Sequence, residues 1–186
     1  MDAMTLLQER NSMGKLTGPV PDREQLDVLY RAALRAPDHK QLTPWRFIEF
    51  SGEGLERLGD LFAEAERREE PDIPEKKLEG ARKKPLRAPM IIAVIAKVVP
   101  DLPKVPPIEQ VLSAGCAAHG ILLAAQAQGL GAMWRTGHFA FNLTVREGLG
   151  LDEHDEIVAF LYLGQPGGRD KRIPERDPAD FVERWT

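Results

Sequence analysis

The chain has 186 residues and a mass of 20.8 kDa; 42% of its residues are hydrophobic and 29% are charged. This composition predicts a folded globular protein and excludes a disordered, collagen-like or disulfide-stapled chain. Twenty-five basic and 29 acidic residues give a net charge of −4, so the charge balance favours neither nucleic acid nor an anionic membrane as a partner.

The compartment is expected from two further features. The single cysteine, Cys116, cannot form a disulfide within the chain, and no apolar signal-peptide core follows Met1. We therefore expect a cytoplasmic protein. We also expect no membrane span, because we find no apolar run in the sequence that approaches the length needed to cross a bilayer.

Two helices are expected before Pro37. Residues 2–10 form the first, and Asn11, Ser12 and Gly14 break it. The second begins after Asp22, with a capping partner three residues on, and stops before the proline. Its apolar residues recur at helical spacing: Leu26, Leu29, Tyr30, Ala33 and Leu34.

The middle of the chain alternates strand and helix patterns. Residues 46–50 predict a short strand and residues 54–68 a helix. Mixed charge over residues 64–87 indicates a solvated helix pair. Residues 90–97, bounded by Pro89, are almost wholly apolar and predict a strand buried on both faces.

Residues 108–128 predict a long helix, apolar nearly all round and therefore central. Glycines end it, and a short strand at 132–136, a small helix near 145–149 and a second apolar strand at 157–163 follow. The rest, residues 164–186, contains Phe181 and Trp185, which need a surface to lie on. No repeat or linker divides the chain, so residues 1–186 predict one α+β domain.

Strong catalytic motifs are absent from the sequence, which has no GxxxxGK[ST], no GxGxxG after a strand, no HExxH and no GxSxG. Cys116 and His119 could share a helix face toward a metal. Two ligands without a third are a weak signal, so core packing is the preferred interpretation and no metal site is nominated. A buried thiol is likewise not expected to act as a nucleophile.

Cations and hydroxyls near helix ends remain as candidates. Arg10, Ser12 and Lys15 follow the first helix, and Arg135 and Thr136 follow the glycines that end the long one. A guanidinium, a hydroxyl and free backbone amides together suit a phosphate. From the residues alone, solvated side chains remain the more frequent explanation.

The loop at residues 37–45 also leaves two interpretations open. It is either a proline-stiffened turn in which Trp45 closes the core, or a segment whose His39 and Lys40 meet a ligand or another subunit.

The chain resembles the nitroreductase family, and within it a minimal-length bacterial branch, in segments that follow in order. They are RNS near residue 10, RAPDHKQLTPW at 35–45, RAPMIIAVIAK at 87–97, SAGCAAHGILLAAQAQGLGAMWRTG at 113–137 and IVAFLYLGQP at 157–166. The resemblance implies an intertwined homodimer of α+β nitroreductase-like fold. It also implies a mostly antiparallel central sheet flanked by helices and a long buried core helix. FMN would lie in clefts that both subunits form. Residues 164–186 would be an arm that reaches across the partner.

Carried over residue by residue, the resemblance implies an FMN site. Its members are Arg10, Asn11, Ser12, Arg35, His39, Trp134, Arg135 and Thr136. Arg10 and Ser12 would bind the phosphate and ribityl chain, with Arg135 toward the phosphate, whereas Arg35 and His39 would approach from the other subunit. The nicotinamide nucleotide is assigned to Ala124, Ala125, Gln126, Ala127, Gln128 and Gly129.

The activity implied is hydride transfer from NAD(P)H through FMN to a small-molecule acceptor such as a nitroaromatic or a quinone. This sequence departs from the family pattern at Asn11, at Lys15 and across residues 38–43, where larger members have Ser-x-x-Asn-x-Gln-Pro-Trp. Two alternatives therefore stay open: a non-catalytic flavin-binding storage or sensor protein of the same fold, and a structural or interaction domain.

Overall fold

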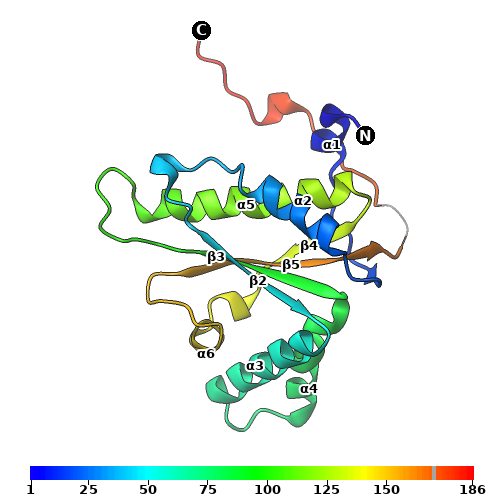
Figure 1. Cartoon of the computed structure of the whole chain (residues 1–186), viewed down its shortest axis with the longest axis vertical. Coiled ribbons are helices and arrows are strands. Elements are labelled where there is room, and N and C mark those ends of the chain that lie inside the picture. Colours follow the sequence, from blue (N-terminus) through cyan, green and yellow to red (C-terminus); the bar gives the residue numbers. More distant parts are fainter. Residues whose placement is uncertain (169–170) are drawn as a thin grey trace.

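An antiparallel sheet forms the centre of the computed structural model, which describes residues 1–168 and 171–186 (Figure 1). Its strands are β1 (Leu16–Thr17), β2 (Trp45–Ser51), β3 (Met90–Ala96), β4 (Gly131–Arg135) and β5 (Glu156–Pro166). They run in the order β1–β5–β3–β2, with β4 paired to β5 as well, and all of these pairings are antiparallel. The structure thus confirms the predicted α+β fold with an antiparallel sheet.

Helices cover both faces of this sheet (Figure 1). They are α1 (Ala3–Glu9), α2 (Arg23–Ala33), α3 (Glu53–Glu69), α4 (Glu75–Lys83), α5 (Pro107–Ala127) and α6 (Leu143–Gly148). α2 and α5 pack on one face, and α3, α4 and α6 on the other. Every residue of β3 is buried, because Ile92 and Val94 face α5 while Ile91 and Ile95 face α3. The strand buried on both faces is confirmed.

Local signals placed the first helices well. Asp22 and Gln25 form the expected capping box, in which each side chain accepts from the other residue's backbone N–H. α2 then ends at Ala33, before Pro37. The sequence does not predict β1, because two residues carry no readable alternation.

The long helix α5 corrects the expectation about apolar runs of membrane-spanning length. By length and composition it would pass for a membrane span, so the expectation that no run approaches that length is wrong. Half of its most apolar window is buried in the chain, and the core helix of a soluble protein passes the same test. Its buried side, including Ala117 and Ile121, packs on the sheet and α2.

The other side of α5 is exposed within one chain. Ile108 and Leu112 are each 60% exposed, and Cys116 and His119 are exposed on the same side. The prediction that Cys116 and His119 pack in the core is therefore wrong, since their spacing puts them on the face that points away from the sheet. Across residues 1–168 and 171–186, no group of three or more His, Cys, Asp or Glu could hold a metal.

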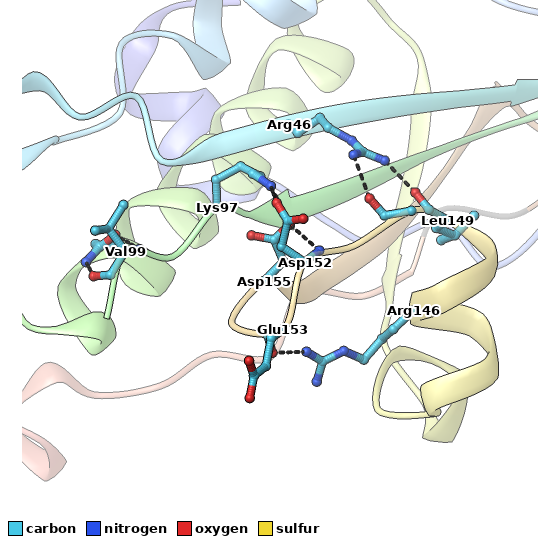
Figure 2. Close-up of polar contacts among 10 residues, drawn as sticks. Arg46, Lys97, Val99, Arg146, Leu149, Asp152, Glu153 and Asp155 are labelled. Carbon is cyan, nitrogen blue, oxygen red and sulfur yellow. Dashed lines mark hydrogen bonds and ion pairs between the residues drawn. The ribbon is translucent and has the colours of Figure 1, made fainter. Parts of the chain in front are cut away.

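A polar network fixes the loop between α6 and β5 (Figure 2). Lys97, one residue past β3, places its Nζ 2.6 Å from the carboxylates of both Asp152 and Asp155. The buried Asp155 carboxylate also accepts the backbone N–H of Asp152. Arg46 donates from β2 to the carbonyls at residues 149 and 150. The loop is thus tied to two strands of the sheet.

The C-terminal residues extend away from the body of the chain beyond α1 (Figure 1). Phe181 is 69% exposed and Trp185 is 90% exposed. These large side chains are therefore exposed to solvent in the single chain, so the chain's own surface does not cover them.

Candidate functional site

The segment after α1, residues 10–15, makes a tight polar corner that we call the Arg10 corner. Arg10 Nη1 donates to Ser12 Oγ at 3.4 Å, and the Ser12 N–H donates to Asn11 Oδ1 at 2.9 Å. Met13 N–H donates to the carbonyl of Ala132 at 2.9 Å, which pins the corner to β4. The structure thus brings the predicted Arg10 and Ser12 together at the edge of the sheet.

Lys171 joins this corner from the far end of the chain. Its carbonyl accepts from Asn11 Nδ2 at 2.8 Å, and a Cβ atom at Gly14 would lie 3.9 Å from its Nζ. A cavity of about 350 Å³ opens here, with Asn11, Gln126 and Lys171 in its lining. The sequence analysis missed Lys171, because no local motif marks it and it lies about 160 residues from its neighbours.

A second cavity lies at the other end of β4, on the side of α3 and α4. We call it the cationic pocket; it measures about 360 Å³ and is lined by Lys84, Arg87, Arg135, Thr136, Gly137, His138, Phe62, Phe139, Phe160 and Tyr162. The Lys84 Nζ lies 4.3 Å from the centre of the Phe139 ring. Its cations therefore stand among aromatic rings, an arrangement that suits a flat ligand with negative charge.

Arg135 carries an unusual polar atom in this pocket. Its Nε is buried and has no hydrogen-bond partner, and it is the one such side-chain nitrogen or oxygen in the part of the chain that the structure describes. A buried donor left unpaired costs about 1–3 kcal/mol, so a ligand that offers an acceptor here would recover that loss. This orphaned N–H is the strongest sign of a binding function in the molecule.

Lys84 and Arg87 are the other cations of the pocket, and the sequence analysis missed both. They stand in the charged stretch interpreted as a solvated helix pair. The helix pair is real, and ion pairs such as Arg82 with Glu75 at 2.8 Å line its surface. Lys84 is different, because its partial burial lowers the pKa of its amine even though the nearby Glu66 carboxylate acts in the opposite direction. The expectation that residues 64–87 are a solvated helix pair is therefore corrected: part of this stretch lines the cationic pocket.

Trp134 and Thr136 flank Arg135 on the end of β4. Trp134 Nε1 donates to Thr136 Oγ1 at 3.2 Å, and the indole packs with the cluster on the α5 face. Strand alternation sends Arg135 to the opposite face, toward Tyr162. The three predicted residues are therefore adjacent, yet only Arg135 and Thr136 line the cationic pocket.

Arg35 and His39 belong to a separate region within one chain. Arg35 lines a cavity of about 450 Å³ that shares no lining residue with the cationic pocket or with the cavity at the Arg10 corner. His39 Nδ1 lies 2.9 Å from Glu109 Oε2, at the start of α5. A single chain does not bring these two predicted residues to the others.

The loop that carries His39 is held in an unusual backbone conformation. Lys40, Gln41 and Thr43 have φ angles of 64°, 53° and 48°, in the left-handed region that non-glycine residues avoid. The Asp38 carboxylate holds this shape, because it accepts the N–H of Leu42 at 3.1 Å and that of Thr43 at 2.7 Å. Local strain of this kind is concentrated at functional sites.

The segment assigned to the nicotinamide nucleotide is the end of α5. Ala124 and Ala125 are buried, and Gly129, with a φ of 75°, ends the helix. Gln128 donates to the carbonyl of Gln25 at 3.2 Å, and Gln126 bonds to the Arg10 corner. Much of this segment is therefore occupied by contacts within the chain.

Comparison with known proteins gives a consistent family. The model of the nitroreductase family matches residues 7–165. The chain is 44% identical over 185 residues to a Haemophilus influenzae protein and 44% identical over 183 residues to YdjA of Escherichia coli, with 98% of each chain covered in both cases. Both relatives carry the name of an NAD(P)H nitroreductase.

Solved structures share the fold. The nitroreductase-like protein of Bacillus cereus has a TM-score of 0.82 at 24% identity, covering 98% of this chain and 95% of the other. A Desulfovibrio desulfuricans protein, named as a nitroreductase and solved in complex with FMN, has 0.73 at 20%, covering 98% and 96%. CinD of Lactococcus lactis, solved with chloramphenicol, has 0.76 at 18%, covering 100% of both. The sheet order, the long helix and these matches agree: the chain belongs to the nitroreductase family.

Proposed function

We propose that the chain is an FMN-dependent oxidoreductase that passes hydride from NAD(P)H to a nitroaromatic, quinone or similar small-molecule acceptor. The observation that carries the proposal is the orphaned, buried Nε of Arg135 among the cations and rings of the cationic pocket. The Desulfovibrio desulfuricans relative with FMN and the Lactococcus lactis relative with chloramphenicol support this choice of ligands.

The residues present fit FMN in charge and in layout. Arg10, Ser12, Lys15 and Lys171 would hold the phosphate, because they place cations and a hydroxyl at one end of β4. The cationic pocket at the other end would receive the flat ring. Arg135, which the resemblance assigned to the phosphate, would in this arrangement lie at the ring end instead. Met13 bonds at Ala132, three residues before Arg135, so the two ends stand about 10 Å apart along the strand. An elongated ligand with an anionic end and an aromatic end suits that spacing. It would pass along the edge of β4 that is not paired to β5, because the two ends lie on opposite faces of the sheet.

FMN, when bound, supplies the hydride-accepting chemistry that no side chain here possesses. The protein's part is to bind and to tune. Lys84, Arg87 and Arg135 favour negative charge in the pocket, and the partial burial of Lys84 and Arg135 strengthens that effect. Phe139 and Tyr162 exclude water from the same space. We therefore nominate no side chain as a general acid or base.

We also propose a homodimer in which the site is completed by both subunits. The outer side of α5 carries Ile108 and Leu112, and the adjacent α1 exposes Met4 and Leu7, so the two helices present a broad apolar surface. Such a surface suits a second copy. Arg35 and His39, which are separate from the Arg10 corner in one chain, would then reach the partner's Arg10 corner, which lies beside α1 and the end of α5.

The C-terminal arm completes this arrangement. Residues 164–186 would reach across the partner, where Phe181 and Trp185 would be covered. We place the protein in the cytoplasm, in keeping with its single unpaired thiol.

The decisive test is the visible absorption spectrum of the purified protein after it is supplemented with FMN and desalted, before and after anaerobic NADPH. A retained flavin band that bleaches supports a reductase. A retained band that does not bleach favours the storage or sensor alternative, to which the strained loop at residues 38–43 lends some weight. A colourless protein would contradict the proposal, since fold does not by itself guarantee function.

A further inference from the structure

Gln126, near the end of α5, holds the backbone on both sides of Arg10. Its Oε1 accepts the N–H of Asn11 at 2.8 Å, and its Nε2 donates to the carbonyl of Glu9 at 3.2 Å. One side-chain amide thus bridges the residue before Arg10 and the residue after it, from a helix more than 100 positions away in the sequence.

The segment that Gln126 holds has few other tertiary contacts; one is the hydrogen bond from Asn11 Nδ2 to the carbonyl of Lys171 at 2.8 Å. α1 is seven residues long, none of them buried, and so short a helix has marginal stability by itself. The chain leaves the helix at Arg10, whose ψ is 126°. After that point, Met13 bonds to Ala132, but this contact lies beyond Ser12. The two hydrogen bonds of Gln126 are therefore the contacts that hold backbone groups on both sides of Arg10.

The amide group matches this task chemically. A carboxamide offers one acceptor oxygen and one donor nitrogen on a planar group, which pair with one backbone N–H and one backbone carbonyl. A carboxylate could accept from Asn11 but could not donate to Glu9. Its negative charge would also oppose an anion at the Arg10 corner.

We propose that Gln126 is a positioning residue for the phosphate end of the FMN site, because it fixes the backbone from which Arg10 and Ser12 extend. The inference rests on the proposed function. Holding donors in place before a ligand arrives removes an ordering cost from binding, and this preorganisation is what the amide contributes. Gln126 then acts through the Arg10 corner and not by contact with a nicotinamide nucleotide.

The test compares FMN with riboflavin, which lacks the phosphate, in fluorescence titrations of the full-length protein freed of flavin. Gln126→Met removes both hydrogen bonds at similar side-chain volume. We expect FMN to bind about tenfold more weakly, as the loss of two hydrogen bonds implies, and riboflavin affinity to stay unchanged. Gln8→Met makes the same change at an exposed position of α1 and should alter neither affinity.

Arg10→Ala, alone and combined with Gln126→Met, separates the possible failures. If Gln126 acts through the Arg10 corner, its substitution costs less once Arg10 is gone, because only the Ser12 contact is left to misplace, and the two losses are less than additive. Additive losses, or an equal loss for riboflavin, would show a merely structural role and overturn the inference. If Arg10→Ala weakens FMN and Gln126→Met does not, the inference alone is wrong. If Arg10→Ala changes nothing, the phosphate assignment itself fails and takes the inference with it.

Discussion

The guanidinium carbon of Arg135 lies 5.3 Å from the centre of the Tyr162 ring, while the Nε of the same arginine is buried without a partner. The tyrosine hydroxyl is not the partner of that donor; it donates to the carbonyl of Lys84 at 3.2 Å. Burial raises the pKa of Tyr162, whereas Arg135 and Arg87 lower it. The unpaired Nε of Arg135 therefore belongs to a guanidinium that lies beside the ring of Tyr162.

Arg135→Met should therefore separate stability from binding. The flavin-free variant loses a cation over a ring but also loses a buried, unpaired N–H, so we expect its free energy of unfolding to stay within about 1 kcal/mol of the parent. FMN affinity should fall at least about tenfold. Urea denaturation measures the first quantity and flavin titration the second. Undiminished FMN affinity would contradict the role given to Arg135.

Lys171→Ala should weaken FMN by about three- to tenfold, because one charge-assisted contact to the phosphate is lost. The dependence of FMN affinity on salt concentration should also become shallower, whereas riboflavin affinity should be unchanged. Lys76→Ala removes an exposed lysine of α4 and serves as the matched control. Equal losses in both variants would point to net charge and not to Lys171.

The network in Figure 2 predicts a pH dependence of stability. Hydrogen bonds to Asp152 and Asp155 raise the pKa of Lys97, and Lys97 lowers the pKa of Asp152. The Asp152 contribution is therefore present above its unfolded pKa of about 3.9 and is lost as pH falls through the folded value. The Lys97 contribution is complete below its unfolded pKa of about 10.4 and is lost as pH rises through the folded value.

Lys97→Met tests this network. At neutral pH the variant should lose about 1–2 kcal/mol of the free energy of unfolding, because the buried Asp155 side chain loses its hydrogen bond and ion pair with Lys97. The figure is modest because the Lys97 side chain is 36% exposed. In urea denaturation the deficit should shrink toward strongly acidic and strongly basic pH. Glu153→Gln is the control, since Arg146 bonds only the backbone carbonyl of that residue; a deficit there, or a deficit in Lys97→Met that ignores pH, would count against the assignment.

Leu112→Glu places a charge on the outer side of α5. If that side is the dimer interface, burial of the new carboxylate should weaken self-association by about tenfold or more. Sedimentation analysis over a range of concentrations measures this. Leu86→Glu changes an equally apolar, exposed residue on the opposite layer, and its association should match the parent. A parent protein that is monomeric at all concentrations tested would contradict the proposal that two subunits share the site.

Elements with strong local signals could be predicted from the sequence, and contacts across the chain could not. Asp22 and Gln25 mark a helix start within four residues, and the apolar run of β3 shows its double burial directly. Lys84 and Arg87 carry no such local signal. In a charged stretch, the sequence does not distinguish a basic residue beside a pocket from one in solvent. Only packing against Phe139 and Tyr162 distinguishes them.

The face of α5 was the least predictable feature. Cys116 and His119 occur in an apolar helix, so composition favours the core, yet a helix buried on one side leaves such residues outside. For the site, the resemblance indicated Arg10, Ser12, Arg135 and Thr136, which the structure places at two ends of one strand. Lys171 and Gln126 join them only through the tertiary fold.

If the proposed dimer forms through the exposed apolar side of α5, the thermal stability of the chain depends on its concentration. A second copy that covers Ile108 and Leu112 would bind the folded chain and not the unfolded one, so mass action would raise the melting temperature as protein concentration rises. Dilution should therefore lower the melting temperature even though no bond within the chain has changed. For such a protein, the melting temperature is a property of the sample at a given concentration and not of the single chain.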